Sequence, residues 1–194
     1  MVRLGIDASQ RVPSCAVSTD SGIAAVMTME KPIENFTTLI QRTLDKAQIR
    51  LDALEEIVVC VGPGSQMGVR TTVVTGNALA LALHVPVTGV LSTDALAAVS
   101  PVRGVQIVAV SAGRRWHTGK YDGDGETLRR LGALEVSDEL PAETCPVLRS
   151  DVHYESGGRL CAEGLLLVAA QHRQLVTQSM LHEAAPYEPG NANG

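Results

Sequence analysis

The stretch that decides the fold class is Ile57-Val58-Val59-Cys60-Val61-Gly62-Pro63-Gly64-Ser65-Gln66-Met67-Gly68. Its first five residues are β-branched or otherwise apolar, which is the pattern of a short buried central strand. A glycine-rich loop over 62–68 follows, and from about Gly68 to His84 the sequence predicts a helix. A buried strand that leads through a tight loop into a helix is typical of an α/β protein.

Three strands and one helix are expected upstream of this stretch. The apolar run Val2–Ala8 reads as a buried strand. The segments Pro13–Thr19 and Gly22–Thr28 form a hairpin, because the turn signal Asp20-Ser21-Gly22 lies between them. Apolar residues at helical spacing give Asn35–Ile49 a single apolar stripe, which predicts an amphipathic helix.

The same alternation continues downstream. Pro86–Leu91 reads as a strand, and Ser92 is expected to cap a helix over Thr93–Ser100 that Pro101 ends. The second half repeats the theme less clearly; its expected elements are the strands Val105–Val110, Trp116–Tyr121, Thr127–Leu134 and Pro146–Leu148 and the helix Leu160–Gln171. We therefore expect two lobes, residues 1–101 and 102–185, and a flexible tail rich in Pro, Gly and Asn over 186–194.

Composition excludes several classes of protein. The 194 residues are 45% hydrophobic, so a folded core is expected. The net charge of −5, from 16 basic and 21 acidic residues, argues against a protein that binds nucleic acid on its own. No apolar run reaches the roughly 18 residues of a membrane span, and no secretory signal is visible. A cytoplasmic location is expected.

The metal-ligating residue types show no paired spacing. The cysteines at positions 15, 60, 145 and 161 form no CxxC pair, and we expect buried free thiols in a reducing cytosol. Because zinc sites usually bring paired Cys or His ligands, no metal site is expected. The five histidines form no HExxH or HxxxH pair and are expected at the surface or at helix caps.

Two segments could carry chemistry. Asp7 ends the first strand, where ligands gather in open α/β sheets, so it could orient a metal-bound phosphate; equally, it could close an Asx-type turn. In the loop, Gly62, Gly64, Ser65 and Gly68 open a helix whose N–H groups could bind an anion. This loop is neither a Walker loop nor GxGxxG, and a tight structural turn is the other interpretation.

The last turns of the helix from Gly68 to His84 are apolar around nearly their whole circumference. Such a helix is either buried on all sides within its own chain or lends one face to another chain. Gly76, which costs roughly 1 kcal/mol in a helix interior relative to Ala, indicates close packing at that point.

In combination, these segments resemble the TsaB (YeaZ) family, the bacterial accessory subunits for threonylcarbamoyladenosine synthesis on tRNA. The resemblance rests on the strand Leu4-Gly5-Ile6-Asp7-Ala8-Ser9, the loop that ends in Gly68-Val69-Arg70, the helix segment Gly76 to Ala80, and the following Val85 to Leu96. It covers roughly residues 1–100, and the C-terminal half is looser. Gln66-Met67 and Ser111 depart from the family pattern.

The resemblance implies an actin/Hsp70/sugar-kinase-like (ASKHA) α/β fold of two RNase H-like lobes, the second one reduced. It also implies a non-catalytic scaffold that binds the TsaD transferase and the TsaE ATPase and reaches tRNA only through that complex. The transferase carries a His-x-x-x-His metal motif on its first helix, and Asn35–Ile49 of this chain contains no histidine. No catalytic or metal-ligating residue is therefore expected.

The implied partner surface lies on the N-terminal helices, which could also pair two copies of the chain. No cofactor is expected on the isolated chain, although ATP or ADP could occupy an interface of the complex. The residues expected at this partner or dimer interface are Phe36, Leu39, Ile40, Val73, Leu79 and Leu83.

Two other functions remain open from the residues. An ATP-dependent phosphotransferase of the sugar- or acetate-kinase class would use Asp7 and the loop 62–68 to hold phosphates, although the second half lacks a clear second phosphate strand. A peptidase would need a nucleophile–base pair or metal ligands, and the sequence shows neither.

Overall fold

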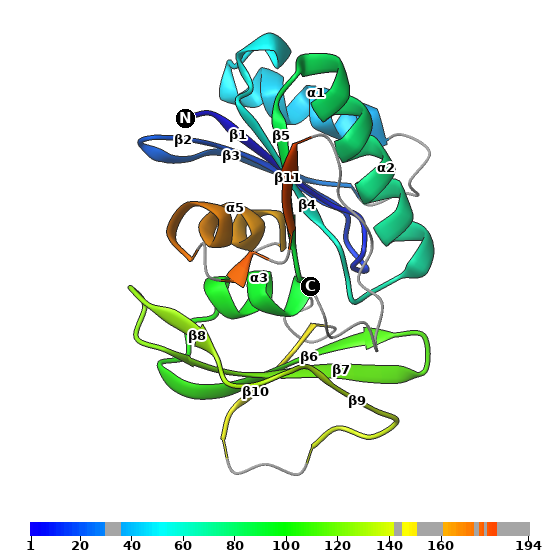
Figure 1. Ribbon diagram of the computed structural model, residues 1–194, viewed down its shortest axis with the longest axis vertical. Helices are drawn as coiled ribbons and strands as arrows, with labels where there is room; N and C mark the ends of the chain where they lie inside the picture. Colours follow the sequence, from blue (N-terminus) through cyan, green and yellow to red (C-terminus); the bar gives the residue numbers. More distant parts are fainter. Residues whose placement is uncertain (30–35, 142–144, 151–160, 173–174, 177, 182–194) are drawn as a thin grey trace.

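The computed structural model describes residues 1–29, 36–141, 145–150, 161–172, 175–176 and 178–181, and its ribbon is shown in Figure 1. Two β-sheets and four α-helices make up this part of the chain. The expected tail over 186–194 lies outside the described residues.

The first sheet has six strands in the order β11-β5-β4-β1-β2-β3. Strand β2 runs antiparallel to both β1 and β3, whereas β1, β4 and β5 are parallel to one another. Strand β11 comes from the C-terminal part and pairs antiparallel with β5. The strands are β1 (Arg3–Asp7), β2 (Ser14–Thr19), β3 (Gly22–Thr28), β4 (Glu56–Cys60), β5 (Pro86–Val90) and β11 (Gln178–Leu181).

The second sheet has the order β10-β6-β7-β8, with the short β9 also paired with β7. Strands β6 and β7 form a long antiparallel hairpin, and β10 runs parallel to β6. The strands are β6 (Gly104–Ala112), β7 (Arg115–Gly123), β8 (Leu128–Arg130), β9 (Glu135–Ser137) and β10 (Val147–Arg149).

The helices divide the molecule into layers, as Figure 1 shows. One face of the first sheet is covered by α1 (Phe36–Ala47) and α2 (Gln66–Leu83), which with that face form one apolar core. Between the two sheets lie α3 (Ser92–Val99) and α5 (Cys161–Gln171), which form the second core. The chain crosses between the layers, because α3 follows the first sheet yet contacts the second, and α5 does the reverse.

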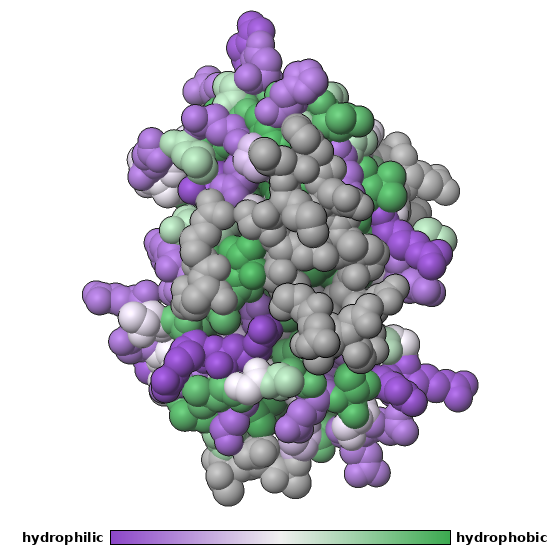
Figure 2. Space-filling view, in the orientation of Figure 1, coloured by the Kyte–Doolittle hydropathy of each residue, from purple (hydrophilic) through white to green (hydrophobic). Residues whose placement is uncertain are grey.

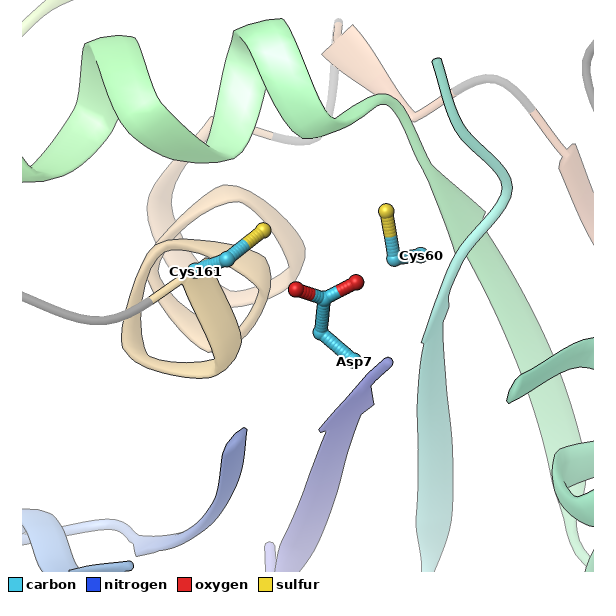
Figure 3. A group of neighbouring side chains, drawn as sticks. All are labelled: Asp7, Cys60 and Cys161. Carbon is cyan, nitrogen blue, oxygen red and sulfur yellow. The ribbon is translucent and has the colours of Figure 1, made fainter. Parts of the chain in front are cut away.

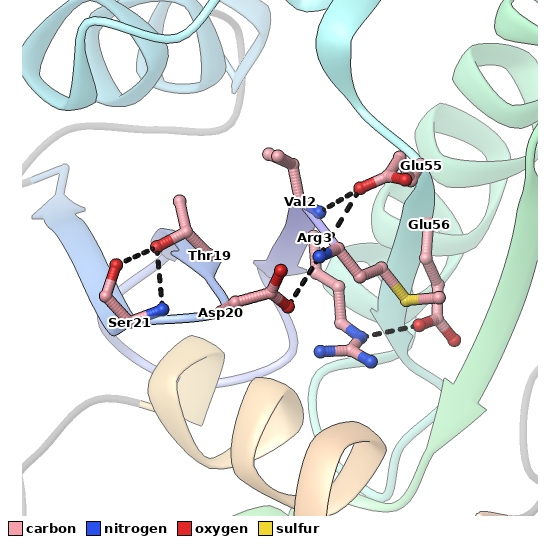
Figure 4. A network of polar contacts seen from close by, with 8 residues as sticks. Val2, Arg3, Thr19, Asp20, Ser21, Glu55 and Glu56 are labelled. Carbon is pink, nitrogen blue, oxygen red and sulfur yellow. Dashed lines mark hydrogen bonds and ion pairs between the residues drawn. The ribbon is translucent and has the colours of Figure 1, made fainter.

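A polar network near the N-terminus fixes the start of β1 (Figure 4). Arg3 Nε donates to Glu56 Oε2 at 2.7 Å, and Thr88 Oγ1 donates to Glu56 Oε1 at 2.6 Å. The buried carboxylate of Glu56 thus links three neighbouring strands, β1, β4 and β5. At the surface, the N-terminal ammonium pairs with Asp20 at 2.6 Å.

Most of the expected elements are present, with boundary shifts of a few residues. Ser92 is an exception, because it lies inside α3 with Leu91 as the cap residue, and its hydroxyl donates to Pro63 O at 2.6 Å instead of capping the helix. The strand expected over 127–134 is shorter in the structure, where β8 covers Leu128–Arg130 and β9 begins at Glu135. No helix within the described ranges is long and apolar enough to cross a bilayer.

Candidate functional site

Asp7 lies fully buried at the carboxyl end of β1. Its Oδ1 accepts two hydrogen bonds from Ser9, from the backbone N at 2.9 Å and from Oγ at 2.6 Å. This is the Asx-type turn that the sequence allowed. Its Oδ2 is buried and accepts no hydrogen bond from an N–H or O–H group of the described residues. Burial raises the pKa of Asp7, and the hydrogen bonds from Ser9 and from the thiols of Cys60 and Cys161 offset only part of that rise.

The glycine-rich loop packs directly on the backbone that follows Asp7. A Cβ on Gly68 would lie 1.8 Å from Ala8 O, so only glycine lets the first turn of α2 approach so closely. Gly64 has a φ of +158°, and a Cβ there would lie 2.5 Å from Ser9 O. Ser65 N donates to Ser9 O at 2.7 Å, and Ala8 N donates to Thr72 Oγ1 at 2.8 Å. The loop and the residue after Asp7 therefore form one packed unit.

The other side of the loop is held by α3 and by Gln10. Ser92 N donates to Gly62 O at 2.8 Å, and Ser92 Oγ and Gln10 Nε2 both donate to Pro63 O. Ser65 caps α2, since its hydroxyl accepts from Gly68 N at 3.4 Å. The structure thus brings together all five residues predicted at the loop site. However, the carbonyls of Gly62 and Pro63 and the N–H groups of Ser65 and Gly68 are already hydrogen-bonded within the protein.

Two thiols complete the surroundings of Asp7 (Figure 3). Cys60 ends β4 and Cys161 begins α5, and one ligand atom from each of these three buried residues lies within 4.8 Å of the others. Burial raises the pKa of Cys60, and the hydrogen bond with Cys60 and burial raise that of Cys161. Sequence spacing gave no signal for this group, because its members are 53 and 101 residues apart.

The histidines do not join this site. His84 ends α2 in the left-handed conformation, as expected of a capping residue. His117 and His172 are buried, which corrects the expectation of a surface or capping position, and burial lowers the pKa of each. The remaining two, at 153 and 182, lie outside the described residues.

The expected partner surface on α1 and α2 needs correction. Phe36, Leu39, Ile40 and Val73 are buried against the first sheet, so they are core residues that a partner cannot contact. The reason is geometric: the amphipathic stripe of α1 faces the sheet that the helix covers. Leu79 and Leu83 are half-buried at the edge of the same core.

The exposed apolar side chains of α2 lie on its other side. Met67, Val74 and Leu81 are 67%, 67% and 61% exposed. They recur every seven residues, so they lie in one line along the helix, and Ala78 and Ala82 are exposed beside them. Figure 2 shows hydrophobic side chains at the edge of the molecule that α2 occupies in Figure 1. We call this line of residues the α2 stripe.

An open groove of about 630 Å³ lies beyond the C-terminal end of α2. Its apolar lining comes from Leu83, Ile49 and Leu51. The polar residues that line it are Gln41, Asp45, Gln48, Arg50 and Asp52. The groove therefore lies close to the end of the α2 stripe, but none of the stripe residues lines it.

Solved structures with the same architecture are found in Pseudomonas aeruginosa. One is an uncharacterized protein with similarity to peptidase YeaZ, which is 21% identical over 96% of this chain and 98% of that one, with a TM-score of 0.76. The other is YeaZ, which is 20% identical over 96% of this chain and all of that one, with a TM-score of 0.73. At this identity the likeness establishes the fold. Among curated proteins, none matches the chain.

The strand order, the crossing helices and these neighbours define an α/β protein of the actin/Hsp70/sugar-kinase-like class, as expected. The family model of TsaD, tRNA N6-adenosine threonylcarbamoyltransferase, matches residues 14–138. The chain belongs to this family. The resemblance to TsaB (YeaZ) drawn from the sequence is confirmed by the family match together with the two full-length structural neighbours.

Proposed function

We propose that the chain is a non-catalytic scaffold subunit for threonylcarbamoyl transfer to the adenosine next to the tRNA anticodon. It acts in the cytoplasm by binding the TsaD transferase and, within that complex, the TsaE ATPase. The single observation that carries this proposal is the α2 stripe. Three large apolar side chains held exposed in a line on one helix are costly to leave in water, and they are the pattern by which a helix contacts another chain.

The state of the loop site supports the non-catalytic part of the proposal. Asp7 is fully buried, and the backbone of residues 8–9 packs against Gly64 and Gly68, which leaves no room for a phosphate on that side of the start of α2. A kinase of the sugar- or acetate-kinase class needs that approach to be open. Also, the sequence of α1 over 36–47 has no histidine, so this helix offers no imidazole for a metal.

The α2 stripe is also the surface through which we expect the chain to bind its partners. Without TsaD, two copies of the chain bury the α2 stripe against each other. When TsaD is present, the transferase contacts the stripe and the groove beside Leu83 instead. The chain alone binds no nucleotide, and ATP or ADP belongs to an interface of the assembled complex. With a net charge of −5, the chain reaches tRNA only through its partners.

The test is binding of the purified chain to TsaD, followed by gel filtration and by calorimetry, with tRNA modification reconstituted alongside. Leu81→Glu is expected to weaken the complex at least 100-fold and to stop modification, because it places a charge in an apolar interface. The control is Ile23→Glu, at another exposed hydrophobic position, on the far edge strand β3.

Unchanged TsaD binding by Leu81→Glu would overturn the proposed surface. ATP turnover by the isolated chain that disappears in Asp7→Ala would overturn the non-catalytic role and favour the phosphotransferase. Both variants are checked by circular dichroism, so that loss of folding is not mistaken for loss of function.

A further inference from the structure

The group Asp7, Cys60 and Cys161 has the composition and the placement of a metal site. Its three ligand atoms, one carboxylate oxygen and two sulfurs, lie within 4.8 Å of one another. Tetrahedral zinc, with bonds of ~2.3 Å to sulfur and ~2.0 Å to oxygen, holds its ligand atoms roughly 3.5–4 Å apart. The three side chains therefore need only a small inward movement to share one ion.

An independent observation points into the same space. In the described part of the chain, Asp7 Oδ2 is fully buried and meets only the weakly donating thiols of Cys60 and Cys161, and Figure 3 shows the carboxylate directed between them. A buried carboxylate oxygen that has only weak S–H donors is poorly satisfied, and native proteins usually satisfy such an atom. A cation held between Asp7, Cys60 and Cys161 satisfies it.

Ser9 prepares the carboxylate for this role. Both of its donors, N at 2.9 Å and Oγ at 2.6 Å, bind the other oxygen, Oδ1. This fixes the orientation of the carboxylate and leaves Oδ2 facing the two thiols. Metal-binding carboxylates are commonly held by such an outer hydrogen bond.

We propose that Asp7, Cys60 and Cys161 bind a single Zn²⁺ ion at the carboxyl ends of β1 and β4. Two sulfur donors exclude Mg²⁺ and Ca²⁺, which take oxygen ligands, and suit a borderline-soft ion. The thiols release their protons to solvent when the ion binds.

The position gives the ion a structural role. Asp7 and Cys60 belong to the first sheet, whereas Cys161 begins the helix that follows the second sheet. One ion would therefore fasten the entry of α5 to the first sheet, between segments far apart in the sequence. This role is independent of the α2 stripe, so that either proposal can fail without the other.

The test is titration of Co²⁺ into the reduced, metal-stripped full-length chain, with the absorption spectrum as the readout. One equivalent is expected to give the sulfur-to-cobalt charge-transfer band and the visible bands of a tetrahedral thiolate site, and Zn²⁺ is expected to displace it. Cys161→Ser removes the charge-transfer band or weakens it strongly. Cys145→Ser, at a half-exposed cysteine outside the group, keeps the spectrum unchanged.

Ser9→Ala provides a second variant, since it keeps all three ligands and is expected to lower metal affinity about 10–100-fold. If Cys161→Ser does not fold, the Co²⁺ affinity of Ser9→Ala still tests the proposed site. Three results would each overturn the site: no charge-transfer band in the wild-type chain at excess Co²⁺, a band of undiminished intensity in folded Cys161→Ser, or Co²⁺ affinity unchanged by Ser9→Ala. A Cys60–Cys161 disulfide in the freshly purified protein would also overturn it.

Discussion

Tyr121 Oη donates a hydrogen bond of 2.6 Å to Asp94 Oδ1, and both residues are fully buried. Arg130 Nη1 lies 3.2 Å and 3.1 Å from the two oxygens of the same carboxylate. Asp94 belongs to the first turn of α3, whereas Tyr121 and Arg130 belong to β7 and β8. This group therefore fastens the helix layer to the second sheet.

The Asp94 carboxyl makes stability depend on pH. Burial raises its pKa from 3.8 to about 6, although Arg130 and Tyr121 act in the opposite direction. The folded chain then holds this proton more tightly than the unfolded chain, so its contribution is complete below about pH 4 and is lost as the pH rises through about 6. We expect the free energy of unfolding to fall by roughly 1–3 kcal/mol across this interval because of Asp94.

Urea unfolding at a series of pH values checks this expectation. Asp94→Asn has no proton to lose, so its stability should fall less steeply than that of the wild type between pH 4 and 6. Asp124→Asn is the contrast, because backbone hydrogen bonds from Thr127 and Glu126 lower the pKa of Asp124, which gives a contribution of opposite sign. Parallel wild-type and Asp94→Asn curves would show that the Asp94 carboxyl does not titrate in this range.

The two middle helices, α3 and α5, pack closely against each other at Ala95 and Gly164. A Cβ on Gly164 would lie 1.9 Å from Ala95 O, which is a backbone atom and cannot turn away. Gly164→Ala is expected to lower the free energy of unfolding by about 2–4 kcal/mol, despite the higher helix propensity of Ala. Gln171→Ala, at the exposed end of the same helix, should change it by less than ~0.5 kcal/mol. Equal melting temperatures for the two variants would contradict the close packing.

The sequence predicted most of the regular elements because their signals are local. Periodic apolar residues indicated α1 and α2, and the turn at residues 20–22 indicated the β2–β3 hairpin. Strand β11 was not predicted, since it exists through pairing with β5 and not through a pattern of its own. Ser92 was predicted as a cap because the sequence shows a hydroxyl residue just before a helix. The sequence does not show that this hydroxyl donates to the carbonyl of Pro63, which is distant in the chain.

The site was predictable only where its residues are neighbours in the chain. Asp7 and the loop 62–68 stand at strand ends, so topology places them together. Cys161 could not be assigned to them, because a helix that follows the second sheet delivers it. Because α2 is apolar on several faces, its sequence does not indicate which face packs on the sheet. Val73 was therefore predicted at the partner interface, although it is buried in the core.

Glu56 and Glu55 are adjacent residues with opposite surroundings, as Figure 4 shows. The side chain of Glu56 is 3% exposed and pairs with Arg3 at 2.7 Å, whereas that of Glu55 is 56% exposed. Glu56→Gln keeps an oxygen for Thr88 but leaves the half-buried Arg3 without its charge partner, so a loss of roughly 2–4 kcal/mol in unfolding free energy is expected. Glu55→Gln should cost less than ~1 kcal/mol. Chemical denaturation measures both, and equal losses would contradict the assigned role of Glu56.

Val73 and Val74 offer the sharpest test of which side of α2 belongs to the core. They are identical and adjacent, yet Val73 is 5% exposed and Val74 is 67% exposed. Val73→Ala is expected to lower the free energy of unfolding by about 1–3 kcal/mol, because it leaves a cavity against the first sheet. Val74→Ala removes the same atoms from solvent-exposed surface and should leave stability within ~0.5 kcal/mol. Binding to TsaD is expected to respond in the reverse order: weaker for Val74→Ala and unchanged for Val73→Ala at temperatures where that variant remains folded. Loss of stability in Val74→Ala would mean that the α2 stripe is already covered by its own chain, and the surface would then have no role in binding a partner.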